Sequence, residues 1–157
     1  MFSLIAAIGK NRELGKNGKL IFHLKDDMKF FRETTKGHKV VMGRKTWESL
    51  PGKLKNRENI VISRNPVPEA DQSVNDLPDF INTHKDSGEE IFVIGGGMVY
   101  FEFLKYAKHL YLTEVNASDS TADTFFPDFD KTNYEKTLIT KGTENGLNYS
   151  ISKYTLK

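Results

Sequence analysis

The sequence predicts an α/β domain with three layers: a mainly parallel central sheet, helices on both of its faces and an antiparallel hairpin at one edge. Three observations predict it. Short apolar runs rich in β-branched residues recur along the chain, as is typical of strands buried on both faces. Helical patterns separate several of these runs, and such alternation implies right-handed crossovers between parallel strands. Towards its end the chain instead alternates in polarity around a turn, which indicates the hairpin.

The expected elements follow one another in order. Strands are predicted for the apolar runs at 2–8, 40–42, 60–62, 91–94 and 110–115. Helices are predicted at 24–35, 44–50, 76–84 and 97–104, with Asn75 as the N-cap of the third. The hairpin is predicted from strands at 134–141 and 147–156, which flank the turn signal Thr143–Gly146.

One connection is long. Residues 9–23 form a polar, glycine-rich segment between the first strand and the first helix. Loops of this length within a small domain are uncommon and often serve as lids or binding loops. A lid and an ordinary surface loop are both compatible with the sequence.

Length and composition exclude several classes of protein. A chain of 157 residues suits one domain, 1–157, with one compact core. The hydrophobic share of 38% and the charged share of 28% suit neither a disordered tail nor a membrane protein. The 23 basic residues are matched by 21 acidic ones and spread along the chain, which argues against a nucleic-acid partner.

The residue types and motifs that the chain lacks exclude further kinds of site and segment. Cysteine is missing, so the chain has no disulfide framework and no cysteine-based zinc site. The 4 histidines are scattered without metal-ligand spacing, and we expect no metal. The apolar run at 2–8 is too short for a signal peptide or a membrane span, so we expect a cytoplasmic protein, with a monomer as the default.

Asp27 is the residue least explained by its helix pattern. Leu24, Met28 and Phe31 share the apolar face of the helix predicted at 24–35, and Asp27 falls on that face. Burial disfavours the charged form of a carboxyl, so such a group must be hydrogen-bonded or have its pKa raised. Either state could serve a substrate. The alternative is that Asp27, in the first turn, interacts with the positive helix end or a backbone amide.

Three glycines link the strand at 91–94 to the helix at 97–104. Gly95, Gly96 and Gly97 would let the backbone approach a pyrophosphate, and the free N–H groups at the helix start would bind it. The motif is not the G-x-G-x-x-G fingerprint, because Val99 and Tyr100 stand where a further spaced glycine is required. A tight packing turn is the alternative.

A second glycine junction favours the binding interpretation. The strand at 40–42 runs into Gly43 and then into a helix whose start carries two cations and a hydroxyl. Cations beside the positive end of a helix suggest a nearby anion. The side chains concerned here and after the strand at 60–62 are Arg44, Lys45, Thr46, Ser63 and Arg64. Ligands of such sheets bind outside the carboxyl ends of the strands, so the two junctions could grip one dinucleotide, and the basic residues favour NADP over NAD.

These features, in this order, resemble bacterial dihydrofolate reductases over nearly the entire chain. The segments that carry the resemblance are 3–7, 41–49, 93–97, 110–113 and 123–127, of which the second reads Val-Met-Gly-Arg-Lys-Thr-Trp-Glu-Ser. The resemblance implies reduction of 7,8-dihydrofolate to tetrahydrofolate by hydride transfer from NADPH.

The resemblance also implies roles for individual residues in substrate binding. Asp27 would bind the amino and N3 side of the pterin and assist protonation at N5, with water delivering the proton. Arg57 would hold the glutamate carboxylate of the substrate, and Tyr100 would lie beside the nicotinamide. The other implied catalytic and substrate-binding residues are Ile5, Ala6, Leu20, Phe22, Met28, Phe31, Arg32, Leu50, Lys53, Leu54, Ile94 and Thr113.

For the cofactor, the resemblance implies a lid and a set of backbone and side-chain contacts. The segment 9–23 would be the lid, with Asp123 as its partner in the loop before the hairpin. The implied cofactor-binding residues are Ala7, Leu14, Gly15, Gly18, Gly43, Arg44, Lys45, Thr46, Ser63, Arg64, Gly95, Gly96, Gly97, Met98, Val99, Tyr100 and Thr124.

The chain departs from the family pattern at one dipeptide. Ile21 and Phe22 stand where the family usually has Pro-Trp. Phenylalanine lacks the indole N–H that would bind an ordered water, and isoleucine frees the φ angle that proline fixes. We therefore predict slower turnover or weaker substrate binding than in a Pro-Trp relative.

Two other functions remain compatible with the sequence. A pyrimidine reductase of the riboflavin pathway shares the fold and cofactor, although Asp27 with Arg57 favours the folate substrate. A non-catalytic module that binds NADPH or folate is the second, and Phe22 keeps it open.

Overall fold

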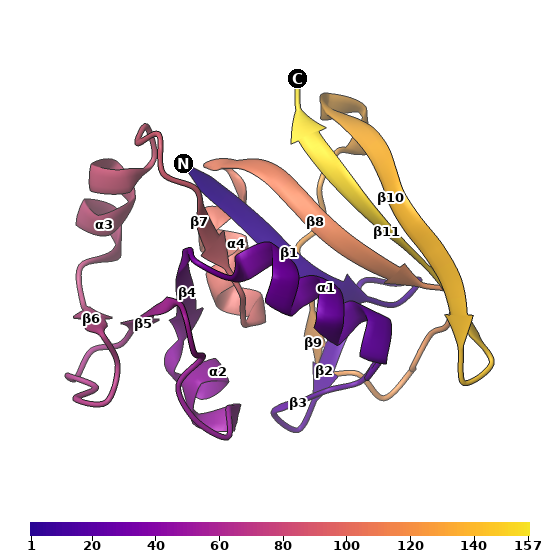
Figure 1. Ribbon diagram of the computed structural model, residues 1–157, viewed down its shortest axis with the longest axis horizontal. Coiled ribbons are helices and arrows are strands. Elements are labelled where there is room, and N and C mark those ends of the chain that lie inside the picture. Colours follow the sequence, from indigo (N-terminus) through magenta and orange to yellow (C-terminus); the bar gives the residue numbers. More distant parts are fainter.

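The computed structural model describes all 157 residues and contains one large and one small sheet (Figure 1). The large sheet has the strand order β10-β11-β8-β1-β7-β4-β5-β6. Its strands are β1 (Phe2–Ile8), β4 (Lys39–Gly43), β5 (Glu58–Ile62), β6 (Gln72–Val74), β7 (Ile91–Val93), β8 (Ala107–Val115), β10 (Tyr134–Glu144) and β11 (Leu147–Leu156). The helices are α1 (Lys25–Thr35), α2 (Arg44–Ser49), α3 (Leu77–His84) and α4 (Gly97–Leu104), and a short 3₁₀ helix spans Lys131–Asn133.

The pairing of the strands confirms the predicted fold class. Every neighbouring pair from β8 through β1, β7, β4 and β5 to β6 is parallel, whereas β11 pairs antiparallel with both β8 and β10. The antiparallel hairpin therefore forms one edge of a mainly parallel sheet. The short apolar runs form the strands of this sheet, because their alternate residues pack on both of its faces.

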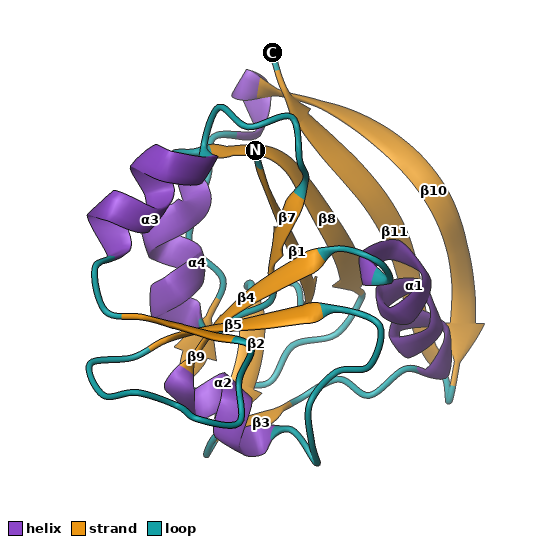
Figure 2. Ribbon diagram, turned by 60° about the vertical axis from the view of Figure 1, so that its left-hand side comes forward, coloured by secondary structure: helices purple, strands orange, loops and turns teal.

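Helices cover both faces of the sheet (Figure 2). On one face, Phe80 of α3 and Phe103 of α4 join Phe2 and Leu4 of β1 in the largest core cluster. The opposite face carries a smaller cluster, in which residues of β1, β4 and β7 meet side chains of α1 and α2, Trp47 among them. A third cluster lies where α1 meets β8 and β11.

The segment 9–23 is more ordered than a plain loop. It contains β2 (Glu13–Lys16) and β3 (Lys19–Leu20), and β2 also pairs with β9 (Thr124–Phe125) to complete the small sheet. The sequence did not indicate these strands, because each is short and the partner of β2 lies more than a hundred residues away. The helix predicted from 76 also starts later, since Asp76 and not Asn75 is the N-cap of α3 and accepts from the Asp79 N–H at 3.0 Å.

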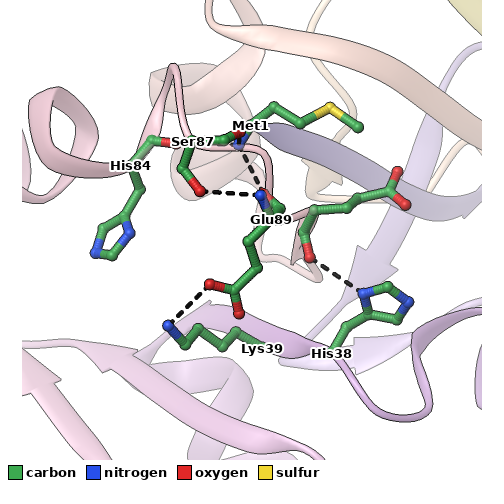
Figure 3. Close-up of polar contacts among 7 residues, drawn as sticks. Met1, His38, Lys39, His84, Ser87 and Glu89 are labelled. Carbon is green, nitrogen blue, oxygen red and sulfur yellow. Dashed lines mark hydrogen bonds and ion pairs between the residues drawn. The ribbon is translucent and has the colours of Figure 1, made fainter.

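Polar contacts fasten the amino ends of the parallel strands (Figure 3). The ammonium of Met1 donates to the backbone carbonyls of His84, Ser87 and Glu89 at 3.0, 2.8 and 2.7 Å. The Glu89 carboxylate also pairs with Lys39 at the start of β4, at 3.1 Å. These contacts join β1, the segment after α3 and β4 at one end of the sheet, and they leave the carboxyl ends free for a binding site. None of the helices combines the length and the apolar character that a membrane-spanning segment requires.

Candidate functional site

Asp27 and Thr113 meet at the centre of the candidate site. The Thr113 hydroxyl of β8 donates to Oδ1 of Asp27 at 2.5 Å. Thr113 is buried, and it is fixed because β8 lies between β1 and β11 in the sheet. The two residues that the resemblance places at the same end of the substrate ring are therefore in direct contact.

The surroundings of Asp27 favour its protonated form. Burial raises the pKa of the Asp27 carboxyl, the hydrogen bond from Thr113 lowers it, and the negative charge of Glu144 raises it again, with a net increase. No basic side chain forms an ion pair with Asp27. A larger share of this carboxyl is therefore protonated at a given pH than for an ordinary aspartate.

The expected pocket walls are open rather than closed. Met28, which the helix pattern placed on a buried face, is 53% exposed, and Leu20 is 58% exposed. The side chains of Phe31, Leu50 and Leu54 are half-buried and pack at the margin of the second core cluster. Apolar groups that stay accessible around a half-buried carboxyl are suited to a flat ligand rather than to the core.

Phe22 lies deeper than its neighbours in the lid. It is 8% exposed and packs with Leu24, Val115, Tyr149 and Ile151 in the third core cluster. The Phe22 ring therefore packs the end of the segment 9–23 against β8 and β11. Thr113, the hydrogen-bond partner of Asp27, also lies on β8.

A basic cavity of about 660 Å³ lies beside α1. Its lining includes Arg32, Lys53, Leu54 and Arg57 together with Lys36. Burial and the charge of Arg32 both lower the pKa of Arg57, whose Nε is buried without a hydrogen-bond partner. Lys53 instead forms an ion pair with Asp71, so Arg57 and Arg32 are the cations most available to a carboxylate ligand.

The two glycine junctions lie side by side. The Gly43 N–H donates to the carbonyl of Gly95 at 2.9 Å, and the Thr46 hydroxyl lies 3.5 Å from the positions that Cβ atoms would take on Gly95 and Gly96. Gly95 has a φ of +127°, a conformation that favours glycine. A Cβ on Gly97 would come within 3.0 Å of Thr124. The sequence predicted that these junctions share one site, and the geometry brings them together.

The start of α4 offers free hydrogen-bond donors. Its N-cap Gly96 has no side chain to bind the first amides, whereas α3 is capped by Asp76. The N–H groups of Gly97, Met98 and Val99 precede the first intrahelical donor, the Tyr100 N–H, which bonds to the Gly96 carbonyl, so they are available to an anion. This uncapped helix start fits the pyrophosphate of a dinucleotide.

Cationic and hydroxyl side chains flank this helix start. Arg44 donates to the Ser63 hydroxyl at 3.3 Å and lies 3.6 Å from Glu48, and it remains exposed. Lys45 and Arg64 are exposed and make no ion pair. The residues that the resemblance assigns to the adenosine side are thus accessible along one rim, next to the glycines.

Tyr100 connects the glycine junction to the first strand. Its hydroxyl donates to the carbonyl of Ile5 at 2.6 Å, and its ring packs on Phe126. Burial and the nearby charge of Asp27 raise the pKa of the Tyr100 phenol far above its usual value, so it remains a hydrogen-bond donor. Ile5, Ala6 and Ala7 follow one another on β1 opposite Tyr111, Leu112 and Thr113, and Ile94 donates its N–H to Val41.

The segment 9–23 is bound to the loop before the hairpin. Asp123 accepts from the Asn17 N–H at 2.9 Å and donates its own N–H to the Gly15 carbonyl at 3.0 Å. The Leu14 carbonyl accepts from Ile21 N–H at 3.2 Å, while Gly18 occupies an exposed turn with a φ of +77°.

Sequence reasoning missed three polar residues around the site. Glu13 is 1% exposed at the base of the lid and accepts from the Asn11 and Asp119 N–H groups. Tyr149 and Glu144 of the hairpin bind the first turn of α1. A glutamate at a position where the pattern calls for an apolar residue is the signal that could have indicated Glu13. The sequence around Glu144 predicts only a turn.

Comparisons with known proteins agree with this geometry. The family model described as dihydrofolate reductase matches residues 1–156. A dihydrofolate reductase of Bacillus subtilis (strain 168) is 37% identical, and the match covers 100% of this chain and 95% of that protein. The enzyme of the same name from Buchnera aphidicola subsp. Acyrthosiphon pisum is 39% identical, with 95% of each covered.

A solved structure shares the fold. Dihydrofolate reductase from Enterococcus faecalis, complexed with NADP(H) and RAB-propyl, superposes with a TM-score of 0.86 at 28% identity. The match covers 99% of this chain and 96% of that one. The match of sequence over the whole domain, together with the Asp27–Thr113 pair and the two glycine junctions, shows that the chain belongs to the dihydrofolate reductase family.

Proposed function

We infer that the chain reduces 7,8-dihydrofolate to 5,6,7,8-tetrahydrofolate with NADPH as the hydride donor. The observation that carries this function is the half-buried Asp27 carboxyl, held by Thr113 near the carboxyl end of β8, at the same edge of the parallel sheet as the uncapped start of α4. Family membership supports the same reaction and the same cofactor.

Asp27 and Thr113 are assigned to the pterin. The Asp27 carboxyl would bind the amino and N3 side of the ring, and Thr113 would hold the carboxyl in place. Because the pKa of Asp27 is raised, a larger share of the carboxyl is protonated near neutral pH than for an ordinary aspartate. The protonated Asp27 carboxyl would thereby assist the transfer of a proton from water to N5. Arg57 would pair with the glutamate carboxylate of the substrate, since its half-buried cation has no ion-pair partner.

The residues present fit NADPH. The uncapped N–H groups of α4 would hold the pyrophosphate, and the accessible side chains of Arg44, Lys45 and Arg64 would face the 2′-phosphate side. When bound, NADPH supplies a hydride to C6 of the substrate, and water supplies the proton to N5. Residues 9–23 would cover the site and exclude bulk water, in keeping with the hydrogen bonds that join them to Asp123.

Phe22 supports the prediction of weaker catalysis than in a Pro-Trp relative. Its ring is largely buried, and it offers no polar atom that could hold a water beside the pterin. Ring burial keeps the wall apolar, so the reaction itself is retained.

We assign the chain to a single monomeric domain in the cytoplasm, where NADPH and dihydrofolate are available. One sheet runs from Phe2 to Leu156, which supports a single cooperative unit. Size-exclusion chromatography with light scattering should give the mass of one chain, 17.9 kDa. A dimer mass would contradict the monomer.

The function is tested by following absorbance at 340 nm with protein, NADPH and dihydrofolate. We expect decay that requires both small molecules. NADPH binding without decay would instead support a non-catalytic module. A ribosylated pyrimidine substrate distinguishes the remaining alternative: decay with it and none with dihydrofolate would reassign the enzyme to the pyrimidine reductases. Arg57→Gln should raise the KM for dihydrofolate and leave NADPH binding unchanged.

A further inference from the structure

The first turn of α1 is capped from the far end of the chain. Leu24 at the N-cap provides no side-chain hydrogen bond. Glu144, at the end of β10, replaces it: its Oε2 accepts from the Lys25 N–H at 2.7 Å and its Oε1 from the Asp26 N–H at 3.3 Å. Figures 1 and 2 show the tip of the β10–β11 hairpin beside the start of α1. A carboxylate at this place also interacts favourably with the positive helix end.

A second contact from the same hairpin reaches the same turn. The Tyr149 hydroxyl of β11 donates to Oδ2 of Asp26. Tyr149 is buried and lies opposite Gly142 of β10. A Cβ on Gly142 would fall 2.7 Å from the Tyr149 hydroxyl oxygen, so only glycine lets the ring cross the neighbouring strand. The hydrogen bond from Tyr149 to Asp26 raises the pKa of the phenol to about 12, which keeps the donor protonated.

The two contacts end on the residues immediately before Asp27. The hairpin therefore fixes the turn from which the Asp27 side chain extends towards Thr113 on β8. Since β11 pairs with β8, one strand positions both partners of this hydrogen bond. Tyr149 and Glu144 lie more than a hundred residues from α1 in the sequence, and this tether is formed only in the folded chain.

The charge of Glu144 also acts on Asp27. Three groups from other elements interact with Asp27: the Thr113 hydroxyl of β8 donates to it, the Glu144 carboxylate of β10 acts on its pKa, and the charge of Asp27 acts in turn on the pKa of the Tyr100 phenol of α4. On its own helix, Lys25 and Asp26 precede it, and Asp26 is bonded to Tyr149. Glu144 is the anion whose charge raises the pKa of Asp27, in addition to the larger effect of burial.

We propose that Glu144 is a positioning residue for the reduction: it fixes the first turn of α1, and with it Asp27 against Thr113. The proposal rests on the function inferred above. It assigns to a turn residue of the hairpin a role that neither its position in the sequence nor the resemblance suggests.

Glu144→Gln removes the negative charge and keeps the shorter of the two capping hydrogen bonds. Its amide oxygen can still accept from the Lys25 N–H, whereas its NH2 group would face the Asp26 N–H and the longer bond is lost. Glu144→Ala removes the charge and both hydrogen bonds. Glu135→Gln, on the exposed part of the same strand, is the matched control because the Glu135 side chain is exposed and makes no hydrogen bond or ion pair. Two measurements are made on each full-length variant: the ¹³C titration of the Asp27 carboxyl, and the pH dependence of the hydride-transfer rate with NADPH and dihydrofolate.

In Glu144→Gln, we expect the Asp27 titration midpoint to move to lower pH. The hydride-transfer rate should be unchanged on its acid plateau and about two- to fivefold lower on the alkaline limb. Glu144→Ala should show the same shift and a midpoint of thermal unfolding about 2–4 °C lower, since a helix cap is lost. Glu135→Gln should match the parent in both measurements.

Identical Asp27 titrations for Glu144→Gln and the parent would overturn the proposal. The titration needs no turnover, so it tests the positioning even if the parent fails to reduce dihydrofolate. That failure would overturn the proposed function instead.

Discussion

The hydroxyl of Tyr100 donates to the carbonyl oxygen of Ile5 at 2.6 Å, and this hydrogen bond joins α4 to the first strand inside the candidate site. A carbonyl oxygen has two lone pairs, so Ile5 can accept from Tyr100 and from a ligand amino group together. The phenol thereby orients a backbone acceptor that the family resemblance assigns to the pterin.

Tyr100→Phe should therefore weaken both folding and catalysis while leaving the ring in place. Loss of a buried hydrogen bond costs about 1 kcal/mol, which lowers the unfolding midpoint by about 2–4 °C and the hydride-transfer rate by up to about fivefold. Tyr106→Phe is the control, because the Tyr106 hydroxyl has no hydrogen bond. Equal effects of the two substitutions in calorimetry and stopped-flow kinetics would contradict a specific role for the Tyr100–Ile5 contact.

Asp27→Asn is expected to trade activity for stability. The pKa of Asp27 is raised in the folded state, so the ionised carboxylate destabilises the fold progressively as pH rises from the unfolded pKa through the folded one. The amide avoids this cost. Its unfolding midpoint should exceed that of the parent at pH 7–8, and the difference should vanish below the unfolded pKa, 3.8.

The same variant should lose about 10²-fold or more of its reductase activity at pH 7 and regain part of it in acid, where solvent protonates the substrate more readily. Glu33→Gln, on the exposed face of the same helix, is the control. Full activity of Asp27→Asn at neutral pH would remove Asp27 from the mechanism.

Glu13 makes the base of the lid sensitive to acid. Burial raises the pKa of Glu13, but hydrogen bonds from the backbone N–H groups of Asp119 and Asn11 outweigh it, and the net pKa is lowered. A lowered pKa means that Glu13 contributes stability above its unfolded pKa and loses it as pH falls through its folded pKa.

Glu13→Gln should destabilise the protein by about 1–3 kcal/mol at pH 7, because one amide group would turn its N–H towards a backbone donor. Both carboxylate oxygens are engaged: Oε1 accepts from Asn11 at 2.7 Å and Oε2 from Asp119 at 2.6 Å. Denaturant unfolding at pH 7 and at pH 3 should show that the difference between variant and parent shrinks in acid. A difference independent of pH would mean that packing, and not charge, is responsible.

Phe22→Trp should improve turnover or dihydrofolate affinity at some cost in stability. The indole adds an N–H that can hold a water, but the site of Phe22 is largely buried and a larger ring strains it by about 1–3 kcal/mol. Steady-state kinetics and thermal unfolding measure the two effects. Phe101→Trp, at an exposed position of α4, controls for the added indole. Unchanged kcat and KM in Phe22→Trp would refute the prediction.

The parallel sheet could be predicted from the sequence because its signal is local. The runs at β1, β7 and β8 are apolar and rich in β-branched residues, so the burial of each strand can be predicted without identifying its partner strand. The strands that were missed lack such a signal. β2 and β9 contain few apolar residues and are stabilised by pairing with each other across more than a hundred residues. β6 is an edge strand of three residues in which only Val74 is buried.

The residues of the candidate site likewise divide into those with a local sequence signal and those without one. Asp27 was found because a carboxylate interrupts an apolar face, and the glycine junctions because strand, glycine and helix follow one another directly. Met28 was expected on the buried face but remains exposed, because a helix pattern cannot distinguish a core from an open pocket. Glu144 could not be found, since its hydrogen bonds to α1 depend on where the hairpin tip lies in space.

The place of β11 in the sheet has a consequence for biosynthesis. β8, which carries Thr113, borders β1 on one side and β11 on the other, yet 116–146 must leave the ribosome before β11 can follow. Until then, one whole edge of β8 is open, and such edges template aggregation. We expect translation that stalls in this interval to leave β8 unpaired along that edge and α1 without its tether, and therefore to expose the nascent chain to chaperones and proteases.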